Sequence, residues 1–277
     1  MTGDARELML RPGTPGYWYF AKLHNMLMGP QLLVLQVAHP MVGAGVLQHS
    51  NYQDEPWRRL VRTAWSLNIV AYGDPGQALA EVRRLRAMHA SIKGTDDQGR
   101  RYHALHPEAY AWVHATLVRG AVDAERLFGN GIPAGELAGY YQDLRRVGLL
   151  LGLRDQQLPR DVAEFDAYYD EMVRVRLEDN QAVRDVLASI RRPARPTSLV
   201  PEALWWPVAS LLGDRAYLVT VGTLPDVLRE RLSLTWSERD ERRLRRFARQ
   251  VRWAMPLVAP VVIRAARFAV AVRQRRA

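Results

Sequence analysis

Four of the seven histidines of the chain lie between Arg86 and Thr116, in the stretch RAMHASIKGTDDQGRRYHALHPEAYAWVHAT. Histidine is the commonest metal ligand and the side chain best suited to proton transfer near neutral pH. Two of them, His89 and His114, fall on helices predicted on either side of a short turn that contains glycine. Two facing helices that each offer an imidazole to a shared space can hold a metal ion or a haem.

His114 has two interpretations. It lies in the middle of a helix predicted from 107 to 128 that is mostly apolar on all sides and should therefore be buried. Taken alone, a histidine there is a neutral core residue that hydrogen-bonds to a nearby acceptor. The alternative is a metal or haem ligand. The preceding helix favours it, because Arg86 and His89 share one face, and burying two imidazoles and a guanidinium without a bound group would cost on the order of several kcal/mol.

The rest of the chain reads as a series of helices, which predicts an all-α fold in a single domain over residues 1–277. Apolar residues recur at helical spacing in segments 17–28, 31–50, 55–70, 75–91, 107–128, 134–151 and 160–177. We expect His39-Pro40 to break the second segment, because proline clashes with the helical backbone before it. Residues 93–105 are expected to form a turn or a small hairpin, and residues 1–15 a loose lead-in.

The remaining histidines give weaker signals. His103 and His106 have the spacing of some zinc ligands, but no carboxylate or cysteine stands at a matching distance, so a solvated loop is the favoured interpretation. His39, directly before Pro40, is expected to hydrogen-bond at a helix end, and the alternative is that it lines a pocket.

The composition limits the chemistry further. The sequence contains no cysteine. This excludes disulfides, thiolate-bound haem, covalently attached haem and iron–sulfur clusters, and leaves histidine, carboxylate and tyrosine as metal ligands. With 48% hydrophobic residues in a chain of 277, a substantial core is expected. No charged segment followed by an apolar one opens the sequence, so we expect a cytoplasmic protein.

The net charge of +10 comes from the C-terminal segment. Residues 239–277 contain twelve arginines against Asp240 and Glu241, whereas the first 238 residues carry 27 basic and 27 acidic side chains. Residues 238–277 are predicted to form amphipathic helices interrupted at Pro256 and Pro260. Their apolar stripe either docks on the core or makes peripheral contact with an anionic membrane.

Two other roles of this segment are not expected. The apolar run from 261 to 272 is too short and too charged to span a bilayer, which takes about 20 apolar residues. No nucleic-acid partner is expected either, because the charge is not spread over a groove-sized surface with exposed stacking aromatics.

Several motifs that follow one another make the chain similar to a known family. They are LQVAHPMVGAGVLQHS, RRLVRT, YGDPGQAL, MHASIKGTDDQGRRYHALHPEAYAWVHATL, YYQDLRRVGLLLGL and LPRDVAEF, within residues 30–175. In this order they resemble the haem-dependent oxygenases related to latex-clearing protein (rubber oxygenase) and the mycophenolate-pathway oxygenase MpaB. The resemblance implies an all-helical fold with a globin-like core and a b-type haem held between helices by a proximal histidine.

By the same resemblance, His114 in WVHAT matches the proximal ligand of the haem iron, and Arg86 and His89 match positions that line the distal side. The rubber oxygenase has a lysine where this chain has His89, so it stays open whether His89 itself closes the iron in the resting state. The segment from Thr63 to Gly73 contains no carboxylate that would match the distal glutamate of that enzyme. Cleavage of polyisoprene by the same route is therefore not implied.

The resulting hypothesis is a haem b oxygenase that binds dioxygen trans to His114, with Arg86 and His89 donating hydrogen bonds to the oxygen. Its expected substrate is an apolar, unsaturated isoprenoid or lipid in a pocket lined by the segment that begins at His39. The sequence does not identify its electron donor. The alternative is a non-catalytic haem- or lipid-binding protein of the same fold.

Overall fold

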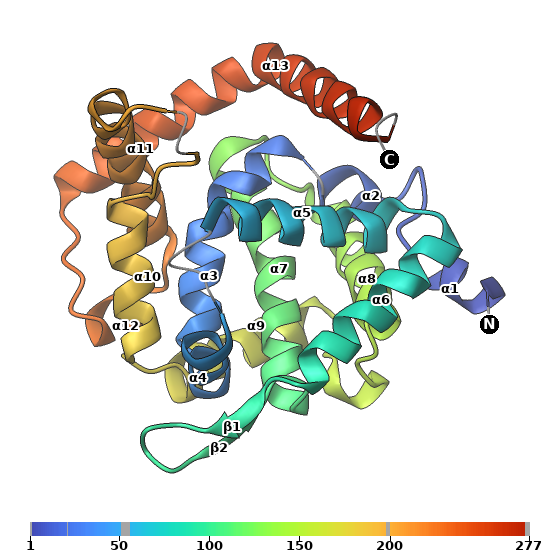
Figure 1. Cartoon of the computed structure of the whole chain (residues 1–277). Helices are drawn as coiled ribbons and strands as arrows, with labels where there is room; N and C mark the ends of the chain where they lie inside the picture. The colour runs from blue at the N-terminus through green and yellow to red at the C-terminus, as the bar shows by residue number, and fades with distance from the viewer. Residues whose placement is uncertain (1, 21, 51–55, 198–199, 275–277) are drawn as a thin grey trace.

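The computed structural model describes residues 2–20, 22–50, 56–197 and 200–274, except the side chains of 2–4, 56–60 and 260–274. The described chain is helical apart from one two-stranded hairpin, which confirms the all-α prediction. Figure 1 shows helix α7 (Pro107–Phe128) in the middle of the molecule. Helices α3 (Gly29–Val37) and α4 (Pro40–His49) lie to one side of it, and α6 (Pro75–Ala90) and α8 (Ala134–Leu150) to the other.

The other elements surround this group. They are α1 (Thr2–Leu8), α2 (Pro15–Tyr19), the 3₁₀ helices η1 (Leu23–Met28) and η2 (Asp155–Gln157), α5 (Pro56–Tyr72), β1 (Lys93–Thr95), β2 (Arg101–His103), α9 (Val162–Glu171), the π-helix η3 (Met172–Arg176), α10 (Gln181–Arg191), α11 (Glu202–Thr223), α12 (Asp226–Arg231) and α13 (Glu238–Gln274). The stretch expected to be a loose lead-in instead contains α1, because Ala5, Met9 and Leu10 are apolar and pack into the core. The prediction of one domain stays a prediction.

Helix α7 is central because nearly every side of it is covered. Trp112 is fully buried, its indole Nε1 donates to the Leu35 carbonyl of α3 at 2.9 Å, and its ring packs on Tyr169 of α9. At the other end of α7, Phe128 packs with Leu218 of α11 and Leu244 of α13 in a second apolar cluster. Residues on α7 are thereby held against helices on several sides at once.

The break predicted at His39-Pro40 is confirmed, since α3 ends at Val37 and α4 begins at Pro40. Across the described parts of the chain, no single helix is long and apolar enough to cross a membrane. One pair, Leu23–Val37 with Pro40–His49, meets this criterion of length and composition only when its two members are taken together, and it is bent by 104°.

The hairpin predicted within 93–105 is also confirmed. Lys93 pairs with His103 and Thr95 with Arg101 in antiparallel register. Gly99 provides the turn with a φ of +78°, a conformation that favours glycine. The Arg100 guanidinium binds both oxygens of Glu178 at 2.9 Å, so the tip of the hairpin is tied to the chain just after η3.

The predicted helix 160–177 is confirmed in position but changes type at Met172, where α9 passes into the π-helix η3. Arg231 of α12 closes the end of η3. Its guanidinium donates to the carbonyls of Val173, Arg174 and Leu177, the first at 3.0 Å and the second at 2.7 Å. A π-helix contains one residue more per hydrogen-bonded ring than an α-helix and exposes carbonyls that a fixed donor can hold.

Helix α13 differs from the prediction, because Pro256 and Pro260 do not end it and Glu238–Gln274 is one helix. Proline at 256 removes the hydrogen bond to the carbonyl of residue 252. Arg252 is exposed, so solvent can satisfy that carbonyl. Residues 275–277 of the predicted segment lie outside the described residues.

Candidate functional site

His114 lies on the side of α7 that faces α8. It is buried, and its Nε2 atom is 2.9 Å from the main-chain carbonyl oxygen of Leu144. Gly148, one turn further along α8, lies directly against the imidazole: a Cβ atom at this position would be 3.0 Å from Nε2. The ring therefore packs on the backbone of α8 at a place where only glycine leaves this much room.

Burial determines the charge of this imidazole. The absence of solvent lowers the pKa of His114 from its ordinary 6.5 to about 4, and the Leu144 carbonyl opposes the shift only partly. The ring is therefore neutral at pH 7. Because a carbonyl can only accept, Nε2 carries the proton in this arrangement and Nδ1 carries the lone pair.

Of the two predicted residues on α6, His89 contacts α7 and Arg86 reaches the turn that follows α8. The ring of His89 packs edge-on against Tyr110, with 5.8 Å between ring centroids, and Tyr110 lies one turn before His114 on α7. The Tyr110 hydroxyl and the Arg86 guanidinium both donate to the carbonyl of Leu151, at 3.3 and 3.4 Å. Tyr110 thus connects α7 to His89 and to the carbonyl that Arg86 also binds, while Arg86 itself is exposed. The grouping of Arg86 and His89 with His114 around one bound group stays a prediction.

Burial lowers the pKa of His89, as it does that of His114. The Leu85 carbonyl, one turn earlier, opposes this shift, and the nearby charge of Arg84 adds to it. Its Nδ1 atom is buried and has no well-oriented hydrogen-bond partner among the described residues. A neutral imidazole with a buried nitrogen that lacks a well-oriented partner is able to donate to or accept from a bound molecule.

These residues fit a haem by the chemistry of their donors. Haem iron takes a neutral imidazole as ligand, and a histidine and an arginine near the opposite side supply polar groups for an oxygen ligand. Gly148 of α8 and Gly152 in the turn after α8 present no side chain to His114 and Arg86, respectively. In the structure this face is closed, so Nε2 of His114 becomes available to a metal only when its hydrogen bond to Leu144 is broken.

His39 is separated from this group. It is fully buried before α4, and its Nε2 atom lies 3.3 Å from Glu108 Oε1, while Arg176 pairs with the other oxygen of Glu108 at 3.0 Å. Glu108 and His114 are six residues apart, or about 240° around a helix, so His39 contacts a different face of α7. The small residues after it also have protein neighbours, since Gly43 lies against Asn180 and Gly45 against Ile92.

Sequence reasoning missed three residues of this region: Tyr110, Gly148 and Gly152. Tyr110 stands four residues before His114 and shares its face, which is a signal that helical spacing contains. Gly148 and Gly152 also stand four apart, at the end of α8. The partner of His39, Glu108, left no such signal because the contact joins segments 69 residues apart.

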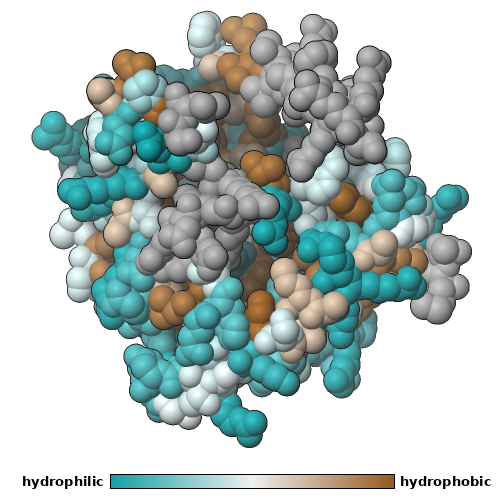
Figure 2. Space-filling model, viewed as in Figure 1, coloured by the Kyte–Doolittle hydropathy of each residue, from teal (hydrophilic) through white to brown (hydrophobic). Residues whose placement is uncertain are grey.

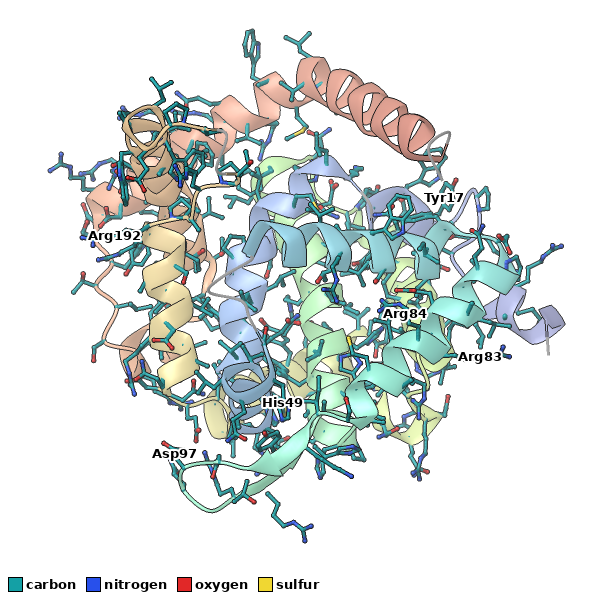
Figure 3. The ribbon with its side chains drawn as sticks, viewed as in Figure 1. Tyr17, His49, Arg83, Arg84, Asp97 and Arg192 are labelled. Carbon is teal, nitrogen blue, oxygen red and sulfur yellow. The ribbon has the colours of Figure 1, made fainter. Side chains whose placement is uncertain are left out.

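The segment 63–73 contains no carboxylate of its own, but Glu81 of the neighbouring helix contacts it. The Ser66 hydroxyl of α5 donates to Glu81 of α6 at 2.5 Å, and Arg84 donates to Glu81 at 2.6 Å. Figure 3 labels Arg84 on the α5 side of α6, with Arg83 further out. The hydrogen bond from Arg84 is the main cause that lowers the pKa of Glu81, so this carboxylate is ionised and already paired.

A second buried charge lies at the far end of α7. Glu125 is fully buried, and its Oε1 atom is 2.8 Å from His24 Nε2 and 2.9 Å from Lys22 Nζ. Burial by itself raises the pKa of this carboxyl, but the bonds from His24 and Lys22 outweigh burial and lower it. The three side chains fix η1 to α7.

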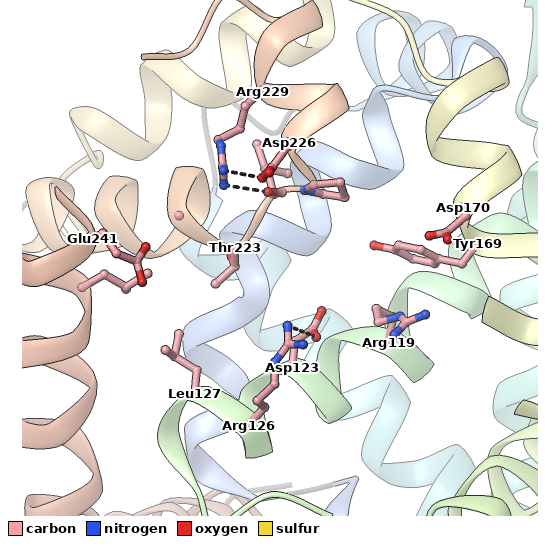
Figure 4. Close-up of a pocket in the computed structure, with 14 residues that line it drawn as sticks. Arg119, Asp123, Arg126, Leu127, Tyr169, Asp170, Thr223, Asp226, Arg229 and Glu241 are labelled. Carbon is pink, nitrogen blue, oxygen red and sulfur yellow. Dashed lines mark hydrogen bonds and ion pairs between the residues drawn. The ribbon is translucent and has the colours of Figure 1, made fainter. Parts of the chain in front are cut away.

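A polar cavity of about 500 Å³ lies between α7, α9, α12 and α13 (Figure 4). Its lining contains three arginines and four carboxylates and no histidine. Asp226 pairs with Arg229 and Asp123 with Arg126, so the charges are largely matched within the wall. Nothing in this lining offers an imidazole to a haem, and the candidate site remains the junction around His114.

The structure gives no support to a zinc site at His103 and His106. His103 Nε2 lies 3.4 Å from the Ala90 carbonyl, and in the described part of the chain no three histidine, aspartate or glutamate side chains lie close enough to hold a metal ion. His49, labelled in Figure 3, instead contacts the Tyr102 hydroxyl of the hairpin at 3.0 Å.

Comparison with known proteins gives a consistent picture. The family model described as "ER-bound oxygenase mpaB/B'/Rubber oxygenase, catalytic domain" matches residues 17–253. Two curated relatives, Uncharacterized protein Mb2261 of Mycobacterium bovis and Uncharacterized protein Rv2237 of Mycobacterium tuberculosis, are each 26% identical to the chain over 222 residues. The aligned region covers 79% of this chain and 84% of each relative. No solved structure matches the chain at a significant level.

Proposed function

Because the chain belongs to the family of the mpaB and rubber oxygenase catalytic domains, we propose that it is a haem b-dependent oxygenase with an apolar, unsaturated isoprenoid or lipid as substrate. The family makes the chain an oxygenase and therefore an oxidoreductase. It is haem-dependent in general and implies dioxygen and an apolar substrate. Three points go beyond the family and are our own proposals: that this chain binds haem, that His114 is the ligand, and that the substrate is an isoprenoid or lipid.

One observation carries the proposal: the buried, neutral imidazole of His114 packs directly on Gly148 of α8. Tyr110, one turn earlier on α7, contacts His89. When bound, the haem supplies the redox chemistry with dioxygen that no side chain can provide. His114 would hold the iron once its Nε2 atom is released from the Leu144 carbonyl, and Arg86 and His89 would donate hydrogen bonds to dioxygen.

The first experiment is an absorption spectrum of the freshly purified protein, before and after addition of haem. A Soret band that needs His114 supports the proposal, and no band after haem addition would overturn it. Oxygen consumption with a chemical reductant and a panel of unsaturated lipids and isoprenoids then tests the activity. Saturated lipids of the same length are the matched controls, because they lack the double bond.

The second candidate is a non-catalytic haem- or lipid-binding protein. Glu81, the carboxylate that contacts Ser66 in the segment 63–73, is already held by Arg84 and Ser66, which favours this alternative. It predicts a haem spectrum without oxygen consumption on any unsaturated substrate. Oxygen consumption by the haem-loaded wild type separates the two candidates. Glu81→Gln then shows whether an active enzyme uses this carboxylate, since turnover would fall while the haem is retained.

A further inference from the structure

The exposed side of α13 changes character along its length. At spacings of three or four residues it presents Arg239, Arg242, Arg246 and Arg249, and then Trp253 and Leu257. Residues at this spacing lie on one stripe of a helix. The Trp253 side chain is 78% exposed and that of Leu257 is 66% exposed, so the stripe is basic first and apolar afterwards.

This stripe is not the one that packs on the protein. The opposite side of α13 supplies Leu244 and Ala248 to the apolar cluster with Phe128 and Leu218. Arg246 and Arg249 point away from that cluster and make no ion pair with any residue that the structure describes. The exposed tryptophan and leucine beyond them, Trp253 and Leu257, therefore face solvent and take no part in the apolar clusters of the described residues.

Helix α11 adds a second apolar stripe beside the first. Leu204, Val208, Leu211 and Leu212 follow helical spacing, and all four are exposed. On another side of the same helix, Trp206 lies in a groove of about 400 Å³ with Arg191 and Arg192. Since α11 packs on α13 through Leu218 and Leu244, the two stripes lie on neighbouring helices, along the upper left and top of Figure 1. Figure 2 shows hydrophobic and hydrophilic residues side by side in the upper left part of the same view.

We propose that the surface formed by the exposed stripes of α11 and α13 docks on an anionic lipid bilayer. Arginines adjoining exposed tryptophan and leucine are the pattern of a helix that lies in the membrane interface, with its cations at the headgroups and its apolar residues below them. The charge is complementary, because residues 239–277 carry the whole net charge of +10. The proposal does not depend on haem.

The same observations disfavour two other occupants. A second copy of the chain would place arginine stripes of the same sign against each other. A nucleic acid would be held by the arginines, but it would leave the leucines of α11 and Leu257 of α13 without a partner. A lipid surface uses both kinds of side chain.

The test is co-sedimentation of the full chain with vesicles of phosphatidylcholine alone or with 30% phosphatidylglycerol (about one anionic lipid in three, enough for a negative surface potential). We expect binding to the anionic vesicles only, weakened by salt, with a blue shift of tryptophan emission. Trp253→Ser/Leu257→Ser should weaken binding by about tenfold or more. Arg246→Gln/Arg249→Gln should do the same at low salt.

The control variants carry the same kinds of substitution on other helices. Arg62→Gln/Arg83→Gln removes the same charge from exposed positions on α5 and α6, and Val175→Ser removes an exposed apolar side chain from η3. Neither should change vesicle binding by more than about twofold. The proposal is overturned by equal losses in the controls, by no binding to anionic vesicles, by a dimer that the α13 variants abolish, or by tighter binding to duplex DNA than to vesicles.

Discussion

The Nε2 atom of His114 lies 2.9 Å from the main-chain oxygen of Leu144, and this hydrogen bond joins α7 to α8 at the candidate site. In the structure His114 is a core residue that donates to α8, and as the proposed iron ligand it would have to give up that bond. The following predictions separate the two roles.

Replacing the proposed ligand should abolish haem binding. For His114→Ala we expect no Soret band after haem addition, because no other imidazole at the junction lies on α7. The haem-free variant should also lose about 2–4 kcal/mol of unfolding free energy, since the change leaves a cavity beside Gly148. His103→Ala on the hairpin is the control and should keep the band. A full Soret band in His114→Ala would contradict the assignment.

Stability of the haem-free protein should fall at acid pH. The pKa of His114 drops from 6.5 in the unfolded chain to about 4 in the folded one, so protons bind more tightly to the unfolded state. The stabilisation is complete above pH 6.5 and is lost as pH falls towards 4, by about 3 kcal/mol. Urea unfolding of wild type and His114→Leu between pH 7 and pH 4.5 measures it.

His39 and His89 act in the same direction, because burial lowers the pKa of each. His114→Leu should therefore reduce the loss of stability with falling pH but not remove it. Equal losses in wild type and variant would show that His114 titrates normally in the folded protein.

A methyl group between α8 and the imidazole should be tolerated poorly. In Gly148→Ala the new Cβ would lie 3.0 Å from Nε2 of His114, so the ring has to move. We expect a loss of about 1–3 kcal/mol in unfolding free energy. Gly135→Ala at the start of the same helix has no neighbour within 4 Å and should be neutral or stabilising by up to about 1 kcal/mol. Equal effects of the two changes on urea midpoints would contradict the close contact.

Removing the buried carboxylate at the other end of α7 should be costly. Glu125→Ala leaves His24 buried without its partner, so we expect a loss of about 3–5 kcal/mol in unfolding free energy. Glu136, which accepts only from Tyr19 at an exposed site, is the matched control, and Glu136→Ala should cost less than about 1 kcal/mol. Thermal unfolding of both variants measures the difference.

The sequence predicted those parts of the fold that local chemistry determines. Proline at 40 separated α3 from α4, and Gly99 marked the hairpin turn. The sequence-based prediction was wrong where a distant contact or exposure to solvent determines the local structure. Helix α13 continues past Pro256 because the affected turn is exposed, and the π-helix η3 depends on Arg231, which lies far along the chain.

The same distinction between local and distant contacts applies to the candidate site. Helical spacing places Arg86 and His89 on one face of α6 and Tyr110 and His114 on one face of α7, whereas the distance between these two faces depends on packing between helices. His39 could not be assigned to a face of α7 from the sequence, because its position depends on Glu108, a contact between segments 69 residues apart. The closed packing of His114 on Gly148 is likewise a property of two helices brought together.

The π-helix at Met172–Arg176 contains one residue more than an α-helical turn at the same place would contain. Deleting a single residue there would let α9 continue as a regular α-helix and would rotate everything after it by about 100°. Arg176 would then turn away from Glu108, and Arg231 would face side chains in place of the carbonyls it now holds. A one-residue deletion at this turn should therefore cost both contacts, whereas a substitution that keeps the length of the turn leaves them in register.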